Sequence, residues 1–391
     1  MEKVRFGIIG VGNQGHSYIV NIFEKGLVEN GYLTAVCDIN PARLDAVKEK
    51  LGDKEIGYYD NHIEMLESGL CDAVLIETPH YDHPQLVEDC LTRGVNVICE
   101  KPAGVYTKQV RLMNEVAEKS DAKFGMMFNQ RTNCLYRKMR ELVRSGEIGE
   151  LQRVTWIITD WFRSQCYYDA GSWRATWDGE GGGVLMNQAP HNLDLWQWIC
   201  GMPSKITAFC HNGKWHDIEV EDDVTIYAEY PNGATGVFIT TTGDCPGDNR
   251  FEITLDKARI TCTASTLEVV ELSEKISEYT YAAEDGFKKL EHNAVEVETD
   301  GMNEQHSGVT NAFAAHILHG TPLVADGAEG INGLTICNAA YLSSWLGNVP
   351  VTLPLDEDLY LAELNKRRAT SKAKKDVQET VAADMSSTFG S

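Results

Sequence analysis

A glycine-rich turn near the start of the chain limits the possible folds more than any other feature. Gly10, Gly12 and Gly15 form a G-x-G-x-x-G array that follows an apolar run and opens a helical pattern. Gly10 permits a tight turn, Gly12 lets the backbone approach a pyrophosphate, and Gly15 lets helix and strand pack closely. Asn13 and Gln14 lie where the helix N-terminus offers free N–H groups to an anion. We therefore expect this turn to bind a dinucleotide.

An acidic residue at the end of the second predicted strand indicates which dinucleotide. Asp38 lies 23 residues after Gly15, about where a carboxylate binds the adenosine ribose hydroxyls. A carboxylate there repels a 2′-phosphate, so the sequence favours NAD over NADP. Arg43, five residues later, could pair with such a phosphate, although a solvent-facing arginine on a helix explains it better.

The texture of the chain changes once along its length. Residues 1–128 alternate short apolar runs with helical patterns, which is typical of a doubly wound parallel sheet. After about residue 150, β-rich runs with hairpin-like breaks indicate a large, mostly antiparallel sheet with a few helices. We predict a Rossmann dinucleotide-binding domain over 1–128, an α+β domain over 129–355, and a polar tail or arm over 356–391.

Composition restricts the partners and the compartment. The 58 acidic residues outnumber the 35 Lys and Arg, giving a formal net charge of −23, which disfavours nucleic acid and membrane surfaces. No apolar run approaches a membrane span, and the N-terminus lacks a signal-peptide pattern. The eleven cysteines are scattered without Cys-x-x-Cys spacing. We therefore expect a cytoplasmic protein with neither a disulfide framework nor a metal site.

The polar tail begins acidic and then turns basic. That order suits a helix macrodipole, so a solvated helix is the simpler interpretation. The alternative is an arm that docks on an acidic neighbouring subunit. The basic residues are Lys366, Arg367, Arg368, Lys372, Lys374 and Lys375.

Together with the glycine array, four segments make the sequence similar to the glucose–fructose oxidoreductase/inositol dehydrogenase (Gfo/Idh/MocA) family. They are Asp72-Ala-Val-Leu-Ile-Glu-Thr-Pro, Cys99-Glu-Lys-Pro, Gly181-Gly-Gly-Val-Leu-Met-Asn-Gln-Ala-Pro-His-Asn-Leu-Asp and Pro350-Val-Thr-Leu-Pro. The resemblance covers residues 1 to about 355. It implies a nicotinamide cofactor and redox chemistry on a secondary hydroxyl of a sugar or cyclitol. It also implies that an open sheet in the second domain joins subunits into a dimer or tetramer.

By this resemblance, Lys101 contacts both the cofactor and the reacting hydroxyl. It lies at the carboxyl end of a predicted parallel strand, where such sheets bind ligands, and a cation stabilises a developing alkoxide. The alternative is a surface lysine fixed by a turn. Thr78, Pro79 and Glu100 are assigned to the cofactor site on the same ground.

The resemblance makes His191 the general acid or base, since an imidazole titrates near neutrality. On pattern alone, a single helix histidine is more often structural. The family commonly has an aspartate where this chain has Asn187, so a charged Asp–His dyad cannot form here. Asn187 is therefore expected either to cap the next helix or to bind a substrate hydroxyl. Asp194 is expected to fix local structure.

An aromatic segment just before the three glycines is the candidate substrate loop. Aromatic rings stack on the apolar face of a sugar, and arginines bind its hydroxyls, although an aromatic core beneath a loop is an equally good explanation. The junction after the last Rossmann strand is a second place where pockets form. The predicted substrate-binding residues are Arg163, Tyr168, Trp173, Arg174, Asn187, Asn129 and Arg131.

These observations predict an NAD-dependent oxidoreductase acting on a small carbohydrate. Hydride would pass between the nicotinamide and a ring secondary hydroxyl, for example the 3-hydroxyl of a glucoside, with Lys101 polarising the oxygen and His191 moving its proton. A glycoside is favoured over free inositol because the aromatic segment could hold a second ring. The alternatives are an NAD-dependent glycoside hydrolase that oxidises, eliminates and re-reduces, an inositol dehydrogenase, and a non-catalytic nucleotide sensor, against which Lys101 and His191 argue.

Overall fold

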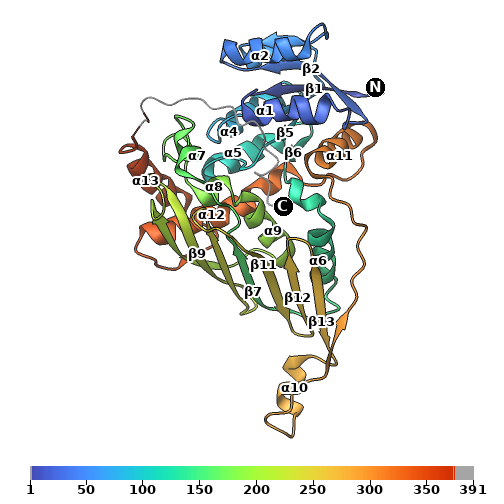
Figure 1. Ribbon diagram of the computed structural model, residues 1–391, viewed down its shortest axis with the longest axis vertical. Coiled ribbons are helices and arrows are strands. Elements are labelled where there is room, and N and C mark those ends of the chain that lie inside the picture. Colours follow the sequence, from blue (N-terminus) through green and yellow to red (C-terminus); the bar gives the residue numbers. More distant parts are fainter. Residues whose placement is uncertain (1, 373, 375–391) are drawn as a thin grey trace.

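The computed structural model describes residues 2–372 and 374, which form two sheets (Figure 1). The first sheet is six-stranded and parallel, with the order β3-β2-β1-β4-β5-β6. The predicted doubly wound parallel sheet is confirmed. Its strands are β1 (Val4–Ile9), β2 (Gly31–Cys37), β3 (Gly57–Tyr59), β4 (Ala73–Ile76), β5 (Asn96–Cys99) and β6 (Phe124–Met126).

Helices connect these strands, and nearby residues in the sequence determine where one of them, α2, begins. Asn40 accepts a hydrogen bond from the Ala42 N–H at 3.0 Å and precedes Pro41, a residue suited to a first helical position. The helices are α1 (Asn13–Ser17), continued by the π-helix η1 (Tyr18–Phe23), then α2 (Pro41–Leu51), α3 (His62–Glu67), α4 (His83–Thr92) and α5 (Thr107–Ala117).

The second sheet has nine strands in the order β14-β13-β12-β11-β7-β10-β9-β8-β15. β10 pairs with β7 in parallel, and the other described pairings of this sheet are antiparallel, which confirms the predicted mostly antiparallel sheet. The strands are β7 (Leu151–Ile158), β8 (Lys205–Asn212), β9 (Glu221–Glu229), β10 (Thr235–Thr241), β11 (Asn249–Leu255), β12 (Ala258–Thr263), β13 (Leu267–Leu272), β14 (His292–Val295) and β15 (Val351–Thr352).

Most helices of the second half pack on one face of this sheet or against the first domain. Trp196 of α9 stacks on Phe238 of β10 with ring centroids 5.5 Å apart, and α12 packs on β8. In contrast, Phe313 of α11 is buried with Phe6 in the core of the first sheet. The helices are η2 (Asn129–Thr132), α6 (Cys134–Ser145), α7 (Gln165–Asp169), α8 (Val184–Asn187), α9 (Pro190–Cys200), α10 (Ile276–Ala282), α11 (Gln305–His319), η3 (Gly327–Glu329), α12 (Gly330–Trp345) and α13 (Glu357–Arg368).

The tail starts as a docked helix rather than a solvated one. α13 buries Tyr360 and Leu364 completely, and the Arg367 guanidinium lies 3.9 Å from the centroid of the Trp345 ring. Lys375 and the rest of the predicted arm lie outside the described residues. The division of the chain at residues 128 and 355 stays a prediction.

Candidate active site

The glycine turn has the shape that the sequence predicts. Gly10 has φ +90°, and a Cβ there would lie 2.7 Å from the Glu77 carbonyl oxygen. A Cβ on Gly15 would lie 2.0 Å from the Gly10 carbonyl oxygen, so helix and strand meet too closely for any side chain. At Gly12 the nearest atom to such a Cβ would be 3.6 Å away, on Arg43. Space above Gly12 and the helix start at Asn13 and Gln14 therefore fit a pyrophosphate.

Asp38 directly follows β2 and is held rigidly beside this turn. Its carboxylate accepts hydrogen bonds from the Val11 N–H at 2.9 Å and from the Asn40 N–H at 2.8 Å. The Arg43 guanidinium lies 3.6 Å from the same carboxylate, so it is paired rather than purely solvent-facing. The geometry fits a carboxylate that binds ribose hydroxyls.

Two buried carboxylates follow the neighbouring strands β4 and β5. Tyr18 donates to Glu100 Oε1 at 3.0 Å, and the Lys101 N–H donates to Glu100 Oε2 at 3.1 Å. Burial raises the pKa of Glu100, and burial together with the nearby Glu100 raises the pKa of Glu77. Thr78 and Glu77 each keep a buried side-chain oxygen that has no hydrogen-bond partner within the described part of the chain. Such oxygens can serve a bound ligand.

The two domains meet at Lys101. Its ammonium group, from the loop after β5, donates to the backbone carbonyl of Asn187 in the second domain at 3.0 Å. Lys101 is partly buried, and this burial lowers its pKa, while Glu100 and then Glu180 raise it. Pro79, at the end of the preceding strand, begins the turn that leads into α4.

His191 lies in the first turn of α9 and is 5% exposed. Neither of its ring nitrogens has a hydrogen-bond partner among residues 2–372 and 374. Burial lowers the pKa of His191 well below its usual value, and the charges of Lys101 and His306 add to this effect. The lowered pKa keeps the imidazole neutral, so one ring nitrogen keeps a lone pair that can accept a hydrogen bond and the other can donate one.

The helix-cap alternative for Asn187 is wrong. α9 begins at Pro190 with Ala189 at its N-cap, whereas Asn187 ends the preceding helix α8. The Asn187 amide nitrogen instead donates a hydrogen bond to Glu180 Oε1. Glu180 is not among the residues predicted from the sequence, where its signal is a single acidic residue within the run Gly179-Glu-Gly-Gly-Gly.

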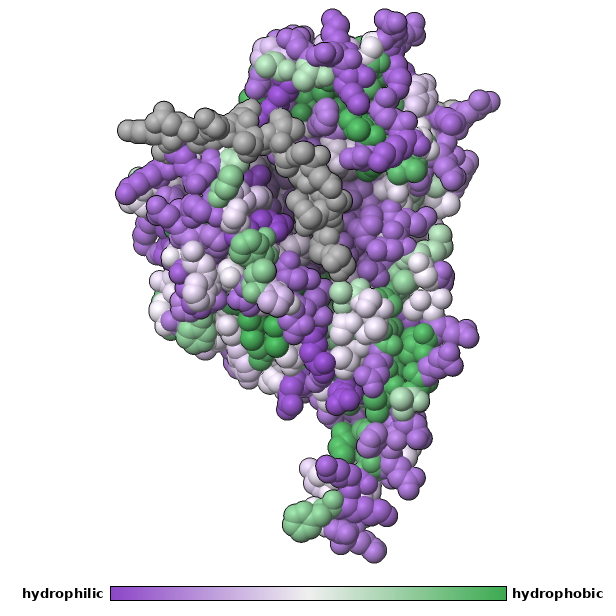
Figure 2. All heavy atoms as spheres, in the orientation of Figure 1, coloured by the Kyte–Doolittle hydropathy of each residue, from purple (hydrophilic) through white to green (hydrophobic). Residues whose placement is uncertain are grey.

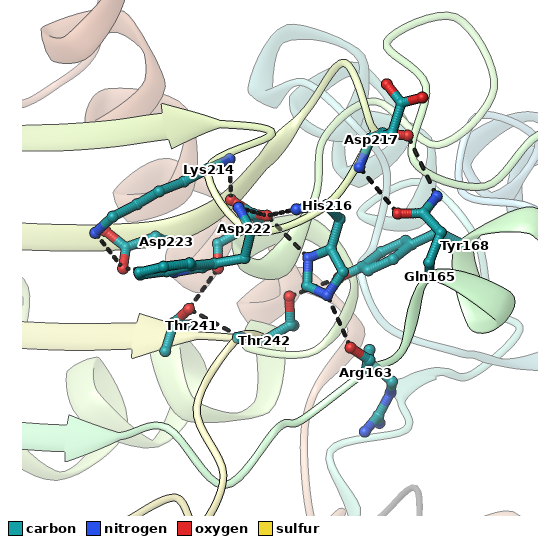
Figure 3. Close-up of polar contacts among 12 residues, drawn as sticks. Arg163, Gln165, Tyr168, Lys214, His216, Asp217, Asp222, Asp223, Thr241 and Thr242 are labelled. Atoms are coloured by element: carbon teal, nitrogen blue, oxygen red, sulfur yellow. Dashed lines mark hydrogen bonds and ion pairs between the residues drawn. The ribbon is translucent and has the colours of Figure 1, made fainter.

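The predicted substrate loop is anchored to the second sheet by the contacts in Figure 3. Tyr168 is 2% exposed, and its hydroxyl lies 2.7 Å from Thr242 Oγ1. His216 bridges the loop and the sheet: one ring nitrogen lies 2.9 Å from Asp222, and the other lies 2.8 Å from the Arg163 carbonyl oxygen. Tyr168 and the Arg163 backbone therefore fix the loop rather than line a pocket.

Two predicted residues, Arg163 and Arg174, contact Tyr167, whereas the tyrosine predicted from the sequence is its neighbour Tyr168. The Arg174 guanidinium lies 4.3 Å from the Tyr167 ring centroid and donates to its hydroxyl at 2.5 Å. The Arg163 guanidinium lies 5.2 Å from the same ring, and Arg174 also lies against Trp173. Arg174 comes within 3.9 Å of Glu180, so this cluster reaches the surroundings of Lys101.

Arg131 has a different position from the one expected. Its side chain is 1% exposed and pairs with Asp194 at 2.7 Å and with Glu329 at 2.7 Å. Its three guanidinium nitrogens all donate within the protein, so the geometry supports a structural role. The Asn129 amide nitrogen donates to Gln305 at 2.5 Å, while its buried Oδ1 has no donor in the described ranges.

The basic tail contacts this chain's own substrate loop. Arg368 pairs with Asp178 at 2.9 Å, the Lys372 N–H donates to Glu219 at 3.1 Å, and Lys374 donates to the Tyr168 carbonyl.

Over residues 2–372 and 374 no group of three His, Cys, Asp or Glu side chains is placed to hold a metal ion. No helix in those residues is long and apolar enough to cross a membrane.

The fold and the site together define a two-domain oxidoreductase that binds NAD. The model of the oxidoreductase family with an NAD-binding Rossmann fold matches residues 4–128, and the GFO/IDH/MocA C-terminal domain matches residues 136–261. The chain belongs to the Gfo/Idh/MocA family.

Relatives and solved structures agree with this assignment. The rhizopine catabolism protein MocA of Rhizobium meliloti is 31% identical over 51% of this chain, a match that spans only 58% of that protein. Myo-inositol 2-dehydrogenase of Thermotoga maritima is 28% identical over 66% of this chain and 74% of its own length. D-glucoside 3-dehydrogenase of Escherichia coli is 26% identical over 59% of this chain and 68% of its own length. The WlbA dehydrogenase of Bordetella pertussis, solved with NADH and UDP-GlcNAcA, shares the fold: TM-score 0.75, 24% identity, covering 90% of this chain and 100% of that one.

Proposed function

We propose that this protein is an NAD-dependent dehydrogenase of a ring secondary hydroxyl in a sugar, glycoside or cyclitol. The observation that carries the proposal is the meeting of Lys101 and the Asn187–His191 segment across the domain junction. An ammonium group and a neutral imidazole are thereby brought together from the two halves of the chain. Relatives named for inositol and D-glucoside oxidation support the same substrate class.

In this proposal each residue has one task. Bound NAD supplies the hydride acceptor, held by the Gly10–Gly15 turn and Asp38. Lys101 donates a hydrogen bond to the substrate oxygen and stabilises the negative charge that develops on it. His191 accepts the hydroxyl proton: its lowered pKa keeps the ring neutral beforehand, and neither nitrogen has a partner within the described residues.

We propose a glycoside, oxidised at its 3-hydroxyl, as the preferred substrate. Tyr167 and Trp173 provide aromatic faces for a sugar ring or an aglycone, and Arg163 and Arg174 hold guanidinium groups against them. The similarity to a D-glucoside 3-dehydrogenase supports this position of oxidation.

A substrate screen tests the proposal. Purified protein is incubated with NAD and with glucose, methyl glucosides, aryl glucosides or inositols, and nicotinamide absorbance is followed. We expect NADH formation to be fastest with a glucoside, and the product to be the 3-keto sugar by NMR. Release of nitrophenol from an aryl glucoside without net NADH would identify a hydrolase instead. NAD binding with no turnover on any polyol would contradict the dehydrogenase proposal.

We also propose that the protein is a cytoplasmic homo-oligomer, a dimer or tetramer joined through the second sheet. Phe209 of β8 and Tyr227 of β9 are 47% and 40% exposed on neighbouring strands. On the face shown in Figure 2, apolar patches gather over the lower half of the molecule, where this sheet lies in Figure 1. All eleven cysteines lie in the described part of the chain and none forms a disulfide. A monomeric mass by light scattering would contradict the oligomer.

A further inference from the structure

Glu180 is the most deeply buried carboxylate beside the reacting groups to which no role has been given. It is 1% exposed and lies in the glycine run between the substrate loop and α8. Oε1 accepts from the Asn187 amide nitrogen, and Oε2 accepts from the Ala175 N–H at 2.5 Å. Arg174 lies 3.9 Å away. Both carboxylate oxygens are therefore fixed, one of them by a residue next to the Lys101 ammonium group.

We propose that Glu180 is a positioning residue: it orients the Asn187 amide and supplies the negative charge that the substrate domain places near Lys101. The inference rests on the proposed function, because Lys101 and Asn187 are the groups proposed to hold the reacting hydroxyl. Glu180 acts through them and does not itself contact substrate.

The orientation follows from hydrogen-bond chemistry. An ionised carboxylate only accepts, so the Asn187 group that faces Glu180 must be its NH₂. The other end of the amide, the Oδ1 acceptor, is thereby directed away from Glu180. Asn187 is then available as a fixed acceptor for a substrate hydroxyl, while its backbone carbonyl holds the Lys101 ammonium group at 3.0 Å.

The charge effect follows from the groups around Lys101. Burial lowers the pKa of Lys101, Glu100 and Glu180 raise it, Arg174 lowers it and Glu77 raises it. The positive charge of Lys101 in turn lowers the pKa of four histidines, which are His80, His83, His191 and His306. Glu77 and Glu100 belong to the cofactor domain, so Glu180 is the carboxylate that the opposite domain contributes to this balance.

Removing the Glu180 charge should therefore move one titration in a defined direction. Lys101 acts as an ammonium group, and without Glu180 its pKa falls further. The ammonium form is then lost at a lower pH. In Glu180→Gln, the alkaline limb of kcat/KM for the best glycoside substrate should shift to lower pH by roughly one unit. Glu180→Asp keeps the charge but is one methylene shorter, so the alkaline limb should remain at the same pH. Because the shorter side chain weakens the hydrogen bond to Asn187, kcat/KM should fall about tenfold.

Glu219 offers a matched control. Its carboxylate accepts from the Trp177 N–H at 2.7 Å and from the Lys372 N–H at 3.1 Å, whereas the charges that shift the pKa of Lys101 are Glu100, Glu180, Arg174 and Glu77. Glu219→Gln should leave the alkaline limb in place. Should Glu180→Gln fail to fold, Arg174→Gln provides the opposite test, since loss of that cation should shift the limb to higher pH.

A second readout separates this inference from the proposed function. The pH dependence of Lys101 acetylation by acetic anhydride, followed by peptide mass spectrometry, reports the same titration without turnover. An acid shift in Glu180→Gln with no dehydrogenase activity in the wild type would support the charge effect and contradict the substrate assignment. An unchanged acetylation profile in folded Glu180→Gln, an unchanged limb in Arg174→Gln, or full kcat/KM in Glu180→Asp would overturn the inference.

Discussion

Replacing Asp194 with asparagine should destabilise the protein strongly without touching the reacting groups. Asp194 is 1% exposed and accepts from Arg131 at 2.8 and 2.7 Å and from Gln197 at 3.0 Å. Asparagine keeps the volume but leaves the Arg131 charge without its buried counter-ion. Breaking a buried pair in this way costs about 3–5 kcal/mol. Glu329 still contacts Arg131 at 2.7 Å and is partly exposed, so we expect about 3 kcal/mol, or roughly 10 °C in Tm for a domain of about 200 residues.

The Arg137–Asp300 pair is the matched control, because it has similar chemistry at the surface. Asp300 lies 2.8 Å from Arg137, and both side chains are more than 40% exposed. Asp300→Asn should leave the unfolding midpoint almost unchanged. Circular dichroism during thermal and urea unfolding, with and without NAD, measures both variants. Equal losses in the two variants, or no loss in Asp194→Asn with raised KM, would refute the structural assignment of Arg131.

Four further substitutions test the site. Lys101→Ala and His191→Ala should each lower kcat by about 10²–10⁴ with little change in NAD affinity by fluorescence titration, and near-normal turnover in either would remove its proposed role. Asp38→Ala should reduce the preference for NAD over NADP, measured as a ratio of kcat/KM values; an unaltered ratio excludes Asp38 from the ribose site. His216→Ala breaks the bridge to Arg163, so KM for the glycoside should rise about tenfold with NAD binding intact, whereas an unchanged KM would show that the loop does not need this anchor.

The cofactor half of the site could be predicted from the sequence because its signals are local. Three glycines at fixed spacing define a turn, and the carboxyl ends of parallel strands always lie at one edge of the sheet. Asp38, Glu100 and Lys101 therefore have to be neighbours of the Gly10–Gly15 turn once the strands are identified.

For the substrate half of the site, the sequence predicts which types of residue are involved but not which individual residues. Aromatic and arginine residues in one segment indicate a sugar-binding loop, but the path of the loop decides which of them face the pocket. The Tyr168 hydroxyl contacts Thr242, and the hydroxyl of its neighbour Tyr167 accepts from Arg174. The position of this loop depends on the contact between His216 and Asp222, which lie more than forty residues further along the sequence. Arg131 is buried because Asp194 and Glu329 reach it from two separate helical elements, a contact that no local pattern encodes.

The amide at position 187 and the carboxylate at position 180 depend on each other. Glu180 already places a buried carboxylate within hydrogen-bond distance of Asn187. An aspartate at 187 would put two carboxylates in contact, and one of them would have to take up a proton, because like charges at that distance cannot both stay ionised. The amide at 187 has the opposite effect: burial raises the pKa of Glu180, and the hydrogen bond from Asn187 lowers it, which favours the charged carboxylate.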